Sequence, residues 1–75
     1  MTLRYVSAEN RDTDDFDVKF SKKEGEAVYD AVTIHGPWAT MTQESFRKHG
    51  RGRLGVGQGQ KYVRQSNGQL HKAEG

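Results

Sequence analysis

The absence of cysteine from a chain of 75 residues limits the possible folds more than any residue that is present. Domains this small bury a smaller share of their surface than larger ones, and disulfides or a structural metal ion often compensate. Without thiols the chain has neither disulfides, thiolate zinc ligands nor a thiol nucleophile. We therefore expect one domain that is held together by a small apolar core, with no metal ion and no cofactor.

The large apolar side chains that recur along the chain predict the residues of that core. We expect its centre at Phe16, Val18, Phe20, Val28, Val32, Ile34, Trp38, Met41 and Phe46, closed by Leu54, Tyr62 and Leu70.

The first half of the chain predicts a β-hairpin. Apolar and polar residues alternate over 16–21, which is typical of a half-buried strand. Residues 22–25 end in a glycine and favour a turn, and 27–34 supply the returning strand. Asp30 interrupts the apolar face of that strand, so it is either a buried functional acid or a residue exposed by an edge position or a bulge. Gly36-Pro37 then predicts a bend before residues 38–41.

A short helix is expected after this bend. Either Thr40 or Thr42 suits its N-cap, and Thr40 with Gln43 fits a capping box. The cations at 47–49 suit a helix C-terminus, and Gly50 is expected to end the helix in a left-handed conformation.

The last third of the chain combines a glycine-rich loop with a second hairpin. Five of the nine glycines fall in residues 50–59, and Asn67-Gly68 predicts a type I′ turn between two strands in 60–73, with their register left open. The whole pattern predicts a small α+β domain over residues 15–75, made of a hairpin, a short helix, the loop and a C-terminal hairpin. Residues 1–14 show weak patterning, and we expect them to form a flexible N-terminal arm, with an edge strand at residues 3–6 as the alternative.

No catalytic motif is recognisable, so we predict that the protein is not an enzyme. Gly50-x-Gly52-x-x-Gly55 matches the dinucleotide-binding pattern as a string, but a helix precedes it and a hairpin follows, where that motif needs a strand and then a helix. The histidines are scattered and do not suggest a metal site. No membrane span or signal peptide is encoded, and a cytoplasmic location is expected.

Charge is distributed unevenly along the chain. Residues 1–30 carry five Lys or Arg against eight Asp or Glu, whereas 31–75 carry seven against two, and no acid occurs between 45 and 73. The hypothesis is a non-catalytic module that binds nucleic acid, or an acidic protein surface, through this basic half. The residues expected to contact nucleic acid are Arg47, Lys48, Arg51, Arg53, Lys61, Tyr62 and Arg64. Alternatively the chain is an adaptor that binds another protein, with Trp38, Tyr29 and Tyr62 as aromatic anchors.

Three motifs occur in an order that is moderately specific: Gly36-Pro37-Trp38-Ala39, then Thr42-x-x-Ser45, then Leu54-Gly55-x-Gly57. In this order residues 27–75 resemble a group of short, largely uncharacterised phage and prophage proteins with a zinc-ribbon-like (treble-clef-like) pattern. The resemblance implies a topology and a viral or prophage setting, and it implies no activity.

The resemblance also implies that a metal site has been lost. The pattern has a Cys-x-x-Cys pair where this chain has Thr42 and Ser45, and an earlier pair falls near Phe16 and Lys19. These side chains lack the nitrogen and sulfur donors of a structural zinc site. We expect aromatic packing to replace the metal, through Phe16, Phe20, Trp38 and Phe46.

Overall fold

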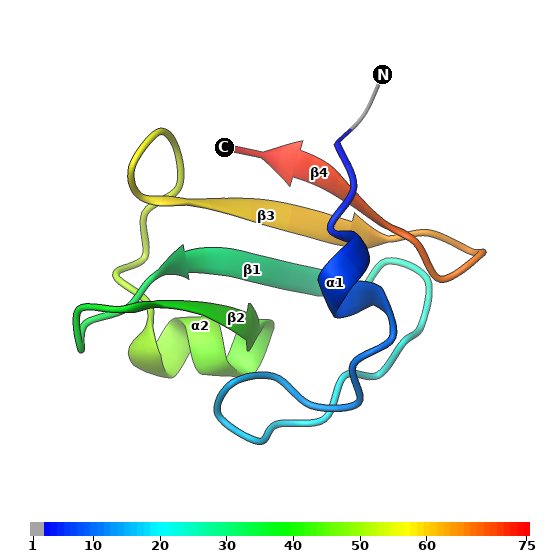
Figure 1. The fold of residues 1–75 in the computed structure, drawn as a ribbon, viewed down its shortest axis with the longest axis horizontal. Coiled ribbons are helices and arrows are strands. Elements are labelled where there is room, and N and C mark those ends of the chain that lie inside the picture. Colours follow the sequence, from blue (N-terminus) through cyan, green and yellow to red (C-terminus); the bar gives the residue numbers. More distant parts are fainter. Residues whose placement is uncertain (1–2) are drawn as a thin grey trace.

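A computed structural model describes residues 3–75, and the first two residues of the predicted N-terminal arm lie outside the described residues. The elements in chain order are α1 (Val6–Glu9), β1 (Ala27–Val32), β2 (Trp38–Thr42), α2 (Gln43–His49), β3 (Gly59–Arg64) and β4 (Leu70–Glu74). The strands form one antiparallel sheet in the order β2-β1-β3-β4 (Figure 1). The chain is thus a small α+β domain, as its sequence pattern predicts.

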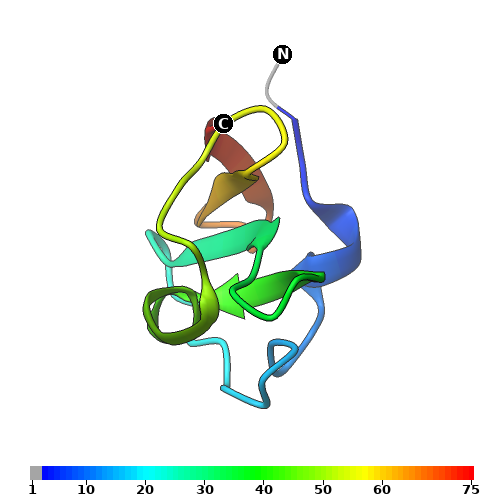
Figure 2. The same cartoon turned by 90° about the vertical axis from the view of Figure 1, so that its left-hand side faces the viewer.

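The two helices lie on opposite faces of the sheet (Figure 2). On the α1 side, Ala8 and Phe20 pack with Val28, Tyr62 and Leu70. On the α2 side the buried residues are Tyr29, Ala31, Ala39 and Met41, with Phe16, Phe46 and Leu54 packed against them. β1 lies between two other strands, and side chains pack against both of its faces. Its buried residues therefore point to both faces: Val28 to the α1 side, and Tyr29 and Ala31 to the α2 side.

Two residues expected in the core are on the surface. Ile34 is 59% exposed and Trp38 is 45% exposed. Ile34 lies in the turn that joins β1 to β2 and Trp38 follows it, and this turn extends beyond the end of the sheet (Figure 1). The core prediction is wrong at these two positions.

Residues 16–21 do not form the strand that their alternating pattern predicts. The carboxylate of Asp14 explains the difference, because its Oδ1 accepts hydrogen bonds from the N–H groups of Phe16 and Val18 (2.8 and 3.0 Å). Such side-chain bonds favour a turn over an extended strand. The predicted hairpin between 16–21 and 27–34 is therefore wrong.

The partner of β1 in its hairpin is instead β2, which occupies the residues expected to form a bend before the helix. Thr40 lies inside this strand, so the capping box with Gln43 does not form. Thr42 is the N-cap of α2, and its Oγ1 accepts a hydrogen bond from the N–H of Ser45 (3.2 Å). Gly50 follows the helix in an extended conformation with a φ of −78°, which corrects the expected left-handed end.

The C-terminal hairpin is confirmed, but its turn differs from the predicted type. A type I′ turn needs positive φ at two central residues, and of the pair Asn67-Gly68 only Gly68 has it (φ 88°). The N–H of Gly68 bonds to the carbonyl of Gln65 (3.0 Å), and that of Gln65 bonds to the carbonyl of Gln69 (2.7 Å). The loop therefore has three residues, 66–68, as in a turn followed by a glycine bulge.

Loop length determines which side chains share a face of this hairpin. Leu70 lies opposite Arg64, so it points to the same face as Tyr62 and away from Val63. A two-residue loop would have placed Leu70 with Val63 instead.

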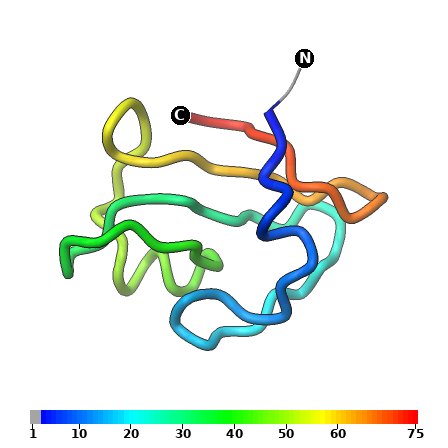
Figure 3. Tube along the Cα trace, in the orientation of Figure 1, coloured from blue at the N-terminus to red at the C-terminus, as the bar shows by residue number. Residues whose placement is uncertain are grey.

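The chain before β1 covers both edges of the sheet. Along β4, the N–H of Tyr5 bonds to the carbonyl of Leu70 (3.0 Å) and that of Lys72 to the carbonyl of Leu3 (2.7 Å), and the trace of Figure 3 passes beside β4 there. Along β2, the N–H of Asp15 bonds to the carbonyl of Thr40 (3.0 Å). Residues 3–14 were expected to form a flexible arm, but they are packed against the domain. The unpaired N–H and C=O groups of an edge strand supply the hydrogen bonds that hold them there.

Candidate functional site

The basic residues of the second half fall into two groups in the structure. Three of them have carboxylate partners: Lys48 with Glu44 (3.5 Å), Lys61 with Glu74 (3.6 Å) and Arg64 with Glu26 (3.1 Å). The pairs of Lys48 and Lys61 lie at the surface, where water screens them and the lysines stay accessible to a partner. The pair of Arg64 is different because it is buried.

Arg64 is 1% exposed, so its guanidinium faces the interior of the fold. Its Nη1 donates to the carbonyls of Glu9 and Gly68 (3.0 Å each), and its Nε and Nη2 donate to the Glu26 carboxylate. These bonds join α1, the segment before β1 and the turn after β3. A buried guanidinium needs partners for its N–H groups, and these bonds supply them. Arg64 is therefore not at the surface with the other predicted contacts.

Tyr62 is buried as well, at 8% exposure, and its ring lies 4.9 Å from that of Tyr5. It contributes to the core on the α1 side and does not present a face for stacking on a base. Tyr29, which the adaptor hypothesis uses, is 7% exposed and stacks on Phe46 with ring centroids 4.1 Å apart. Of the proposed aromatic anchors, Trp38 alone is exposed.

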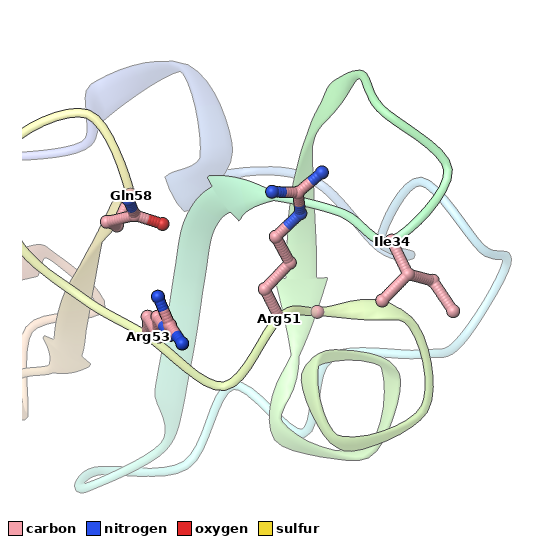
Figure 4. Close-up of a pocket in the computed structure, with 5 residues that line it drawn as sticks. Ile34, Arg51, Arg53 and Gln58 are labelled. Carbon is pink, nitrogen blue, oxygen red and sulfur yellow. The ribbon is translucent and has the colours of Figure 1, made fainter.

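The remaining predicted contacts are Arg47, Arg51 and Arg53, which are exposed. Among residues 3–75, none of the three has a carboxylate within 4.0 Å. Arg51 and Arg53 line one open pocket of about 380 Å³ together with Ile34, Gly50 and Gln58. In Figure 4 both arginine side chains point upward from the segment after α2. Gln58 lies next to Arg53 on the left of the view, and Ile34 lies to the right of Arg51.

The backbone of the glycine-rich loop gives this pocket a defined wall. Gly55 and Gly59 exchange backbone hydrogen bonds in both directions (2.8 and 3.0 Å), which closes residues 55–59 into a small ring. The N–H of Val32 bonds to the carbonyl of Gln58 (3.0 Å) and so attaches this ring to the end of β1. This ring is therefore an ordered support for Gln58, and Arg53 lies two residues before it.

Two histidines that are distant in sequence meet beside the pocket. The Nε2 of His35 lies 3.0 Å from the Nδ1 of His49, and the His49 ring stacks on Phe16 with centroids 4.0 Å apart. Their sequence neighbours Ile34 and Gly50 line the pocket. Sequence reasoning treated these histidines as scattered, since their spacing of 14 residues matches no ligand motif.

Asp30 lies in the middle of β1, with strands on both sides. This position excludes an edge as the reason for its place on an apolar face. Burial, with the negative charge of Asp15 adding to it, raises the pKa of Asp30. Within residues 3–75 its carboxylate has no hydrogen-bond donor, and its cross-strand neighbours are Thr40 and Gln60.

In residues 3–75 no group of three or more His, Cys, Asp or Glu side chains is placed to hold a metal ion. None of the helices in that part of the chain has the length and apolar character needed to cross a membrane. Comparison with protein-family models, with curated proteins and with solved structures gives no match for this chain. The resemblance to the phage proteins thus stays a prediction.

Proposed function

We propose that the protein is a non-catalytic module that binds nucleic acid through the phosphate groups of its backbone. The observation that supports this most directly is the pocket in which Arg51 and Arg53 stand together without a carboxylate partner in residues 3–75. Arginine forms paired hydrogen bonds with phosphate oxygens, and a ligand phosphate supplies the negative charge that the protein does not. Arg47 and Lys48, in the last turn of α2, and Lys61 of β3 add to the positive charge of this half of the chain.

Trp38 gives the same proposal a means of binding bases. It is exposed at the β1–β2 turn, the turn that also carries Ile34 of the pocket. A base that stacks on an exposed indole ring is held without sequence preference, as is typical of proteins that bind single strands. We therefore expect single-stranded DNA or RNA to bind more tightly than a duplex.

The test is a titration with short single-stranded and double-stranded DNA and RNA. Amide shifts measured by NMR locate the contacts, and Trp38, the single tryptophan, reports on base stacking by its fluorescence. Binding should weaken steeply as salt rises, by about 0.7 to 0.9 logarithmic units per phosphate contact for each logarithmic unit of salt. The absence of any amide shift in residues 47–64 at low salt would contradict the proposal.

Charge reversal at the pocket makes the test specific. The double change Arg51→Glu and Arg53→Glu should weaken binding at least about tenfold and lower the salt slope by about two. The double change Lys19→Glu and Lys23→Glu is the matched control, because it alters the net charge by the same amount at two exposed cations in the segment before β1 (Figure 1). An equal effect of the control would mean that only net charge matters.

The second candidate is an adaptor for a host or phage protein. The observation in its favour is that Trp38 and Ile34 are exposed near one another in sequence, at 45% and 59%. Large exposed apolar side chains of this kind often anchor protein interfaces. If the nucleic-acid titration is negative, a pull-down with the native chain and with Trp38→Ala is the next experiment, and a partner that the variant fails to retain supports this candidate.

A further inference from the structure

His35 and His49 come from different elements and are held facing each other. His35 is in the turn between β1 and β2, and His49 is the last residue of α2. The ring nitrogens Nε2 of His35 and Nδ1 of His49 are 3.0 Å apart. The N–H of Ile34 bonds to the carbonyl of His49 (2.8 Å), and the His49 ring is stacked on Phe16. The backbone and one of the two rings are therefore fixed before any ligand binds.

The separation of the two nitrogens fits two ligands of one metal ion. With metal–nitrogen bonds of about 2.0–2.1 Å, two nitrogens on one ion are about 2.9 Å apart at a right angle and about 3.3 Å apart at the tetrahedral angle. The observed 3.0 Å lies between these values. A hydrogen bond also fits this distance, but it requires one ring to donate and the other to accept, whereas an ion uses a lone pair from each.

We propose that His35 and His49 form a solvent-open binding site for a divalent transition-metal ion such as Cu²⁺ or Zn²⁺. Neutral imidazole suits these borderline ions, and water completes the coordination because His35 is exposed. The two nitrogen ligands disfavour hard ions such as Mg²⁺, which prefer oxygen ligands. The cations Arg47, Lys48 and Arg51 are close in sequence and weaken the binding of any divalent ion. The carbonyl end of α2 offsets part of that positive field.

The site is expected to bind weakly and reversibly. Metal-bound histidines usually donate their second ring N–H to a carboxylate or a carbonyl, which fixes the ring and strengthens the ligand. Within residues 3–75 neither the Nδ1 of His35 nor the Nε2 of His49 has such a partner. An ion bound there would join the β1–β2 turn to the end of α2, beside the pocket of Arg51 and Arg53 but independently of it.

The experiment is a titration of the full chain with ZnCl₂ or CuCl₂ alone, followed by NMR of the amides and the histidine rings. We expect saturable binding that shifts residues 34–36 and 49–50 with Zn²⁺ and broadens them with Cu²⁺, and tighter binding of Cu²⁺. His35→Gln should weaken binding about tenfold or more. His49→Phe should do the same while keeping the ring that stacks on Phe16, so loss of folding does not imitate loss of the site.

Two controls separate this site from other causes. His71→Gln removes a histidine of β4 whose Nε2 is bonded to Gln69 (2.8 Å), and it should leave binding unchanged. The Arg51→Glu and Arg53→Glu variant should keep the metal site even if it no longer binds nucleic acid, so the two proposals fail separately. Metal binding that His35→Gln leaves unchanged, signals confined to His71 or to the N-terminus, or no saturation would overturn the proposal.

Discussion

Asp30 shows how one side chain can work against the stability of the fold that contains it. It is half-buried in the central strand β1, and burial raises its pKa. A raised pKa means that the folded state disfavours the charged carboxylate. The contribution of the protonated carboxyl to stability is fully present below the unfolded pKa of about 3.9. It is lost as pH rises through the higher pKa of the folded state. At neutral pH, then, the ionised group costs stability.

Asp30→Asn should therefore stabilise the protein at neutral pH, by on the order of 1 kcal/mol. The gain should shrink on acidification, because Asp30 is then neutral in the native chain as well. Urea unfolding of both chains at several pH values measures this. A variant that is less stable than the native chain at neutral pH would mean that the carboxylate makes a favourable contact.

At the scale of elements, Gly59 at the start of β3 determines how closely β3 approaches β1. It lies opposite Ala31, and a Cβ built on it would overlap the Cβ of Ala31 and lie 2.7 Å from its Cα. Its φ is 152°, in the region that favours glycine. Gly57, two residues earlier in the loop, also has positive φ (76°), but a Cβ there would meet nothing within 4 Å.

These two glycines give a matched pair of substitutions. Gly57→Ala should cost about 1 kcal/mol, because only the backbone conformation is strained. Gly59→Ala should cost about 2–4 kcal/mol, since overpacking against Ala31 adds to that strain. Thermal or urea unfolding of the two variants checks the difference. Equal losses would show that β3 shifts freely away from β1.

Elements with a local signal were the ones that the sequence predicted. The last hairpin was found from Asn67-Gly68, although its loop has one residue more than expected, and Thr42 was one of two candidate caps. The alternation in 16–21 predicted a strand wrongly, because the local bonds of Asp14 bend this segment. Trp38–Thr42 was missed as a strand because residues 27–34 were assigned to a hairpin with 16–21, although the true partner β1 precedes β2 by only the short turn at 33–37.

The candidate site follows the same rule. The exposure of Arg51 and Arg53 could be expected from a glycine-rich loop without acids, and the structure brings these two together in one pocket. The burial of Arg64 could not, because its partner Glu26 lies 38 residues earlier. The contact of His35 with His49 likewise depends on how a turn and a helix pack, which no spacing rule predicts.

For the whole molecule, buried and half-buried carboxylates connect the segment before β1 to the sheet. Asp14 is 2% exposed, and besides its bonds within its own turn its Oδ2 accepts from the N–H and the Oγ1 of Thr42 (2.8 and 2.9 Å). Glu9 bonds to Arg4 and to the N–H of Leu70 (2.8 Å) in β4. Through these two acids, residues 3–20 are attached to both edges of the sheet.

Both attachments should weaken in acid. Burial alone would raise the pKa of Asp14, but the nearby Ser45 hydroxyl and the hydrogen bonds from the backbone N–H groups of Thr42, Val18 and Phe16 outweigh it and lower the pKa. A hydrogen bond from Arg4 lowers the pKa of Glu9. Stability from a lowered carboxyl pKa is present above the unfolded values, about 3.9 for Asp and 4.3 for Glu, and is lost as pH falls through the folded ones.

We therefore expect the free energy of unfolding to fall as pH drops below about 4, with Asp14 as a main cause. Asp14→Asn should cost about 1–3 kcal/mol at neutral pH, because an amide cannot accept all the bonds of the carboxylate. The variant should lose less on further acidification, so the two chains converge at low pH. Asp17→Asn is the control, since Asp17 is exposed and its carboxylate makes no hydrogen bond within residues 3–75. Urea unfolding followed by Trp38 fluorescence measures the free energy of unfolding of all three chains. If Asp14→Asn leaves its pH dependence unchanged, other groups govern acid unfolding.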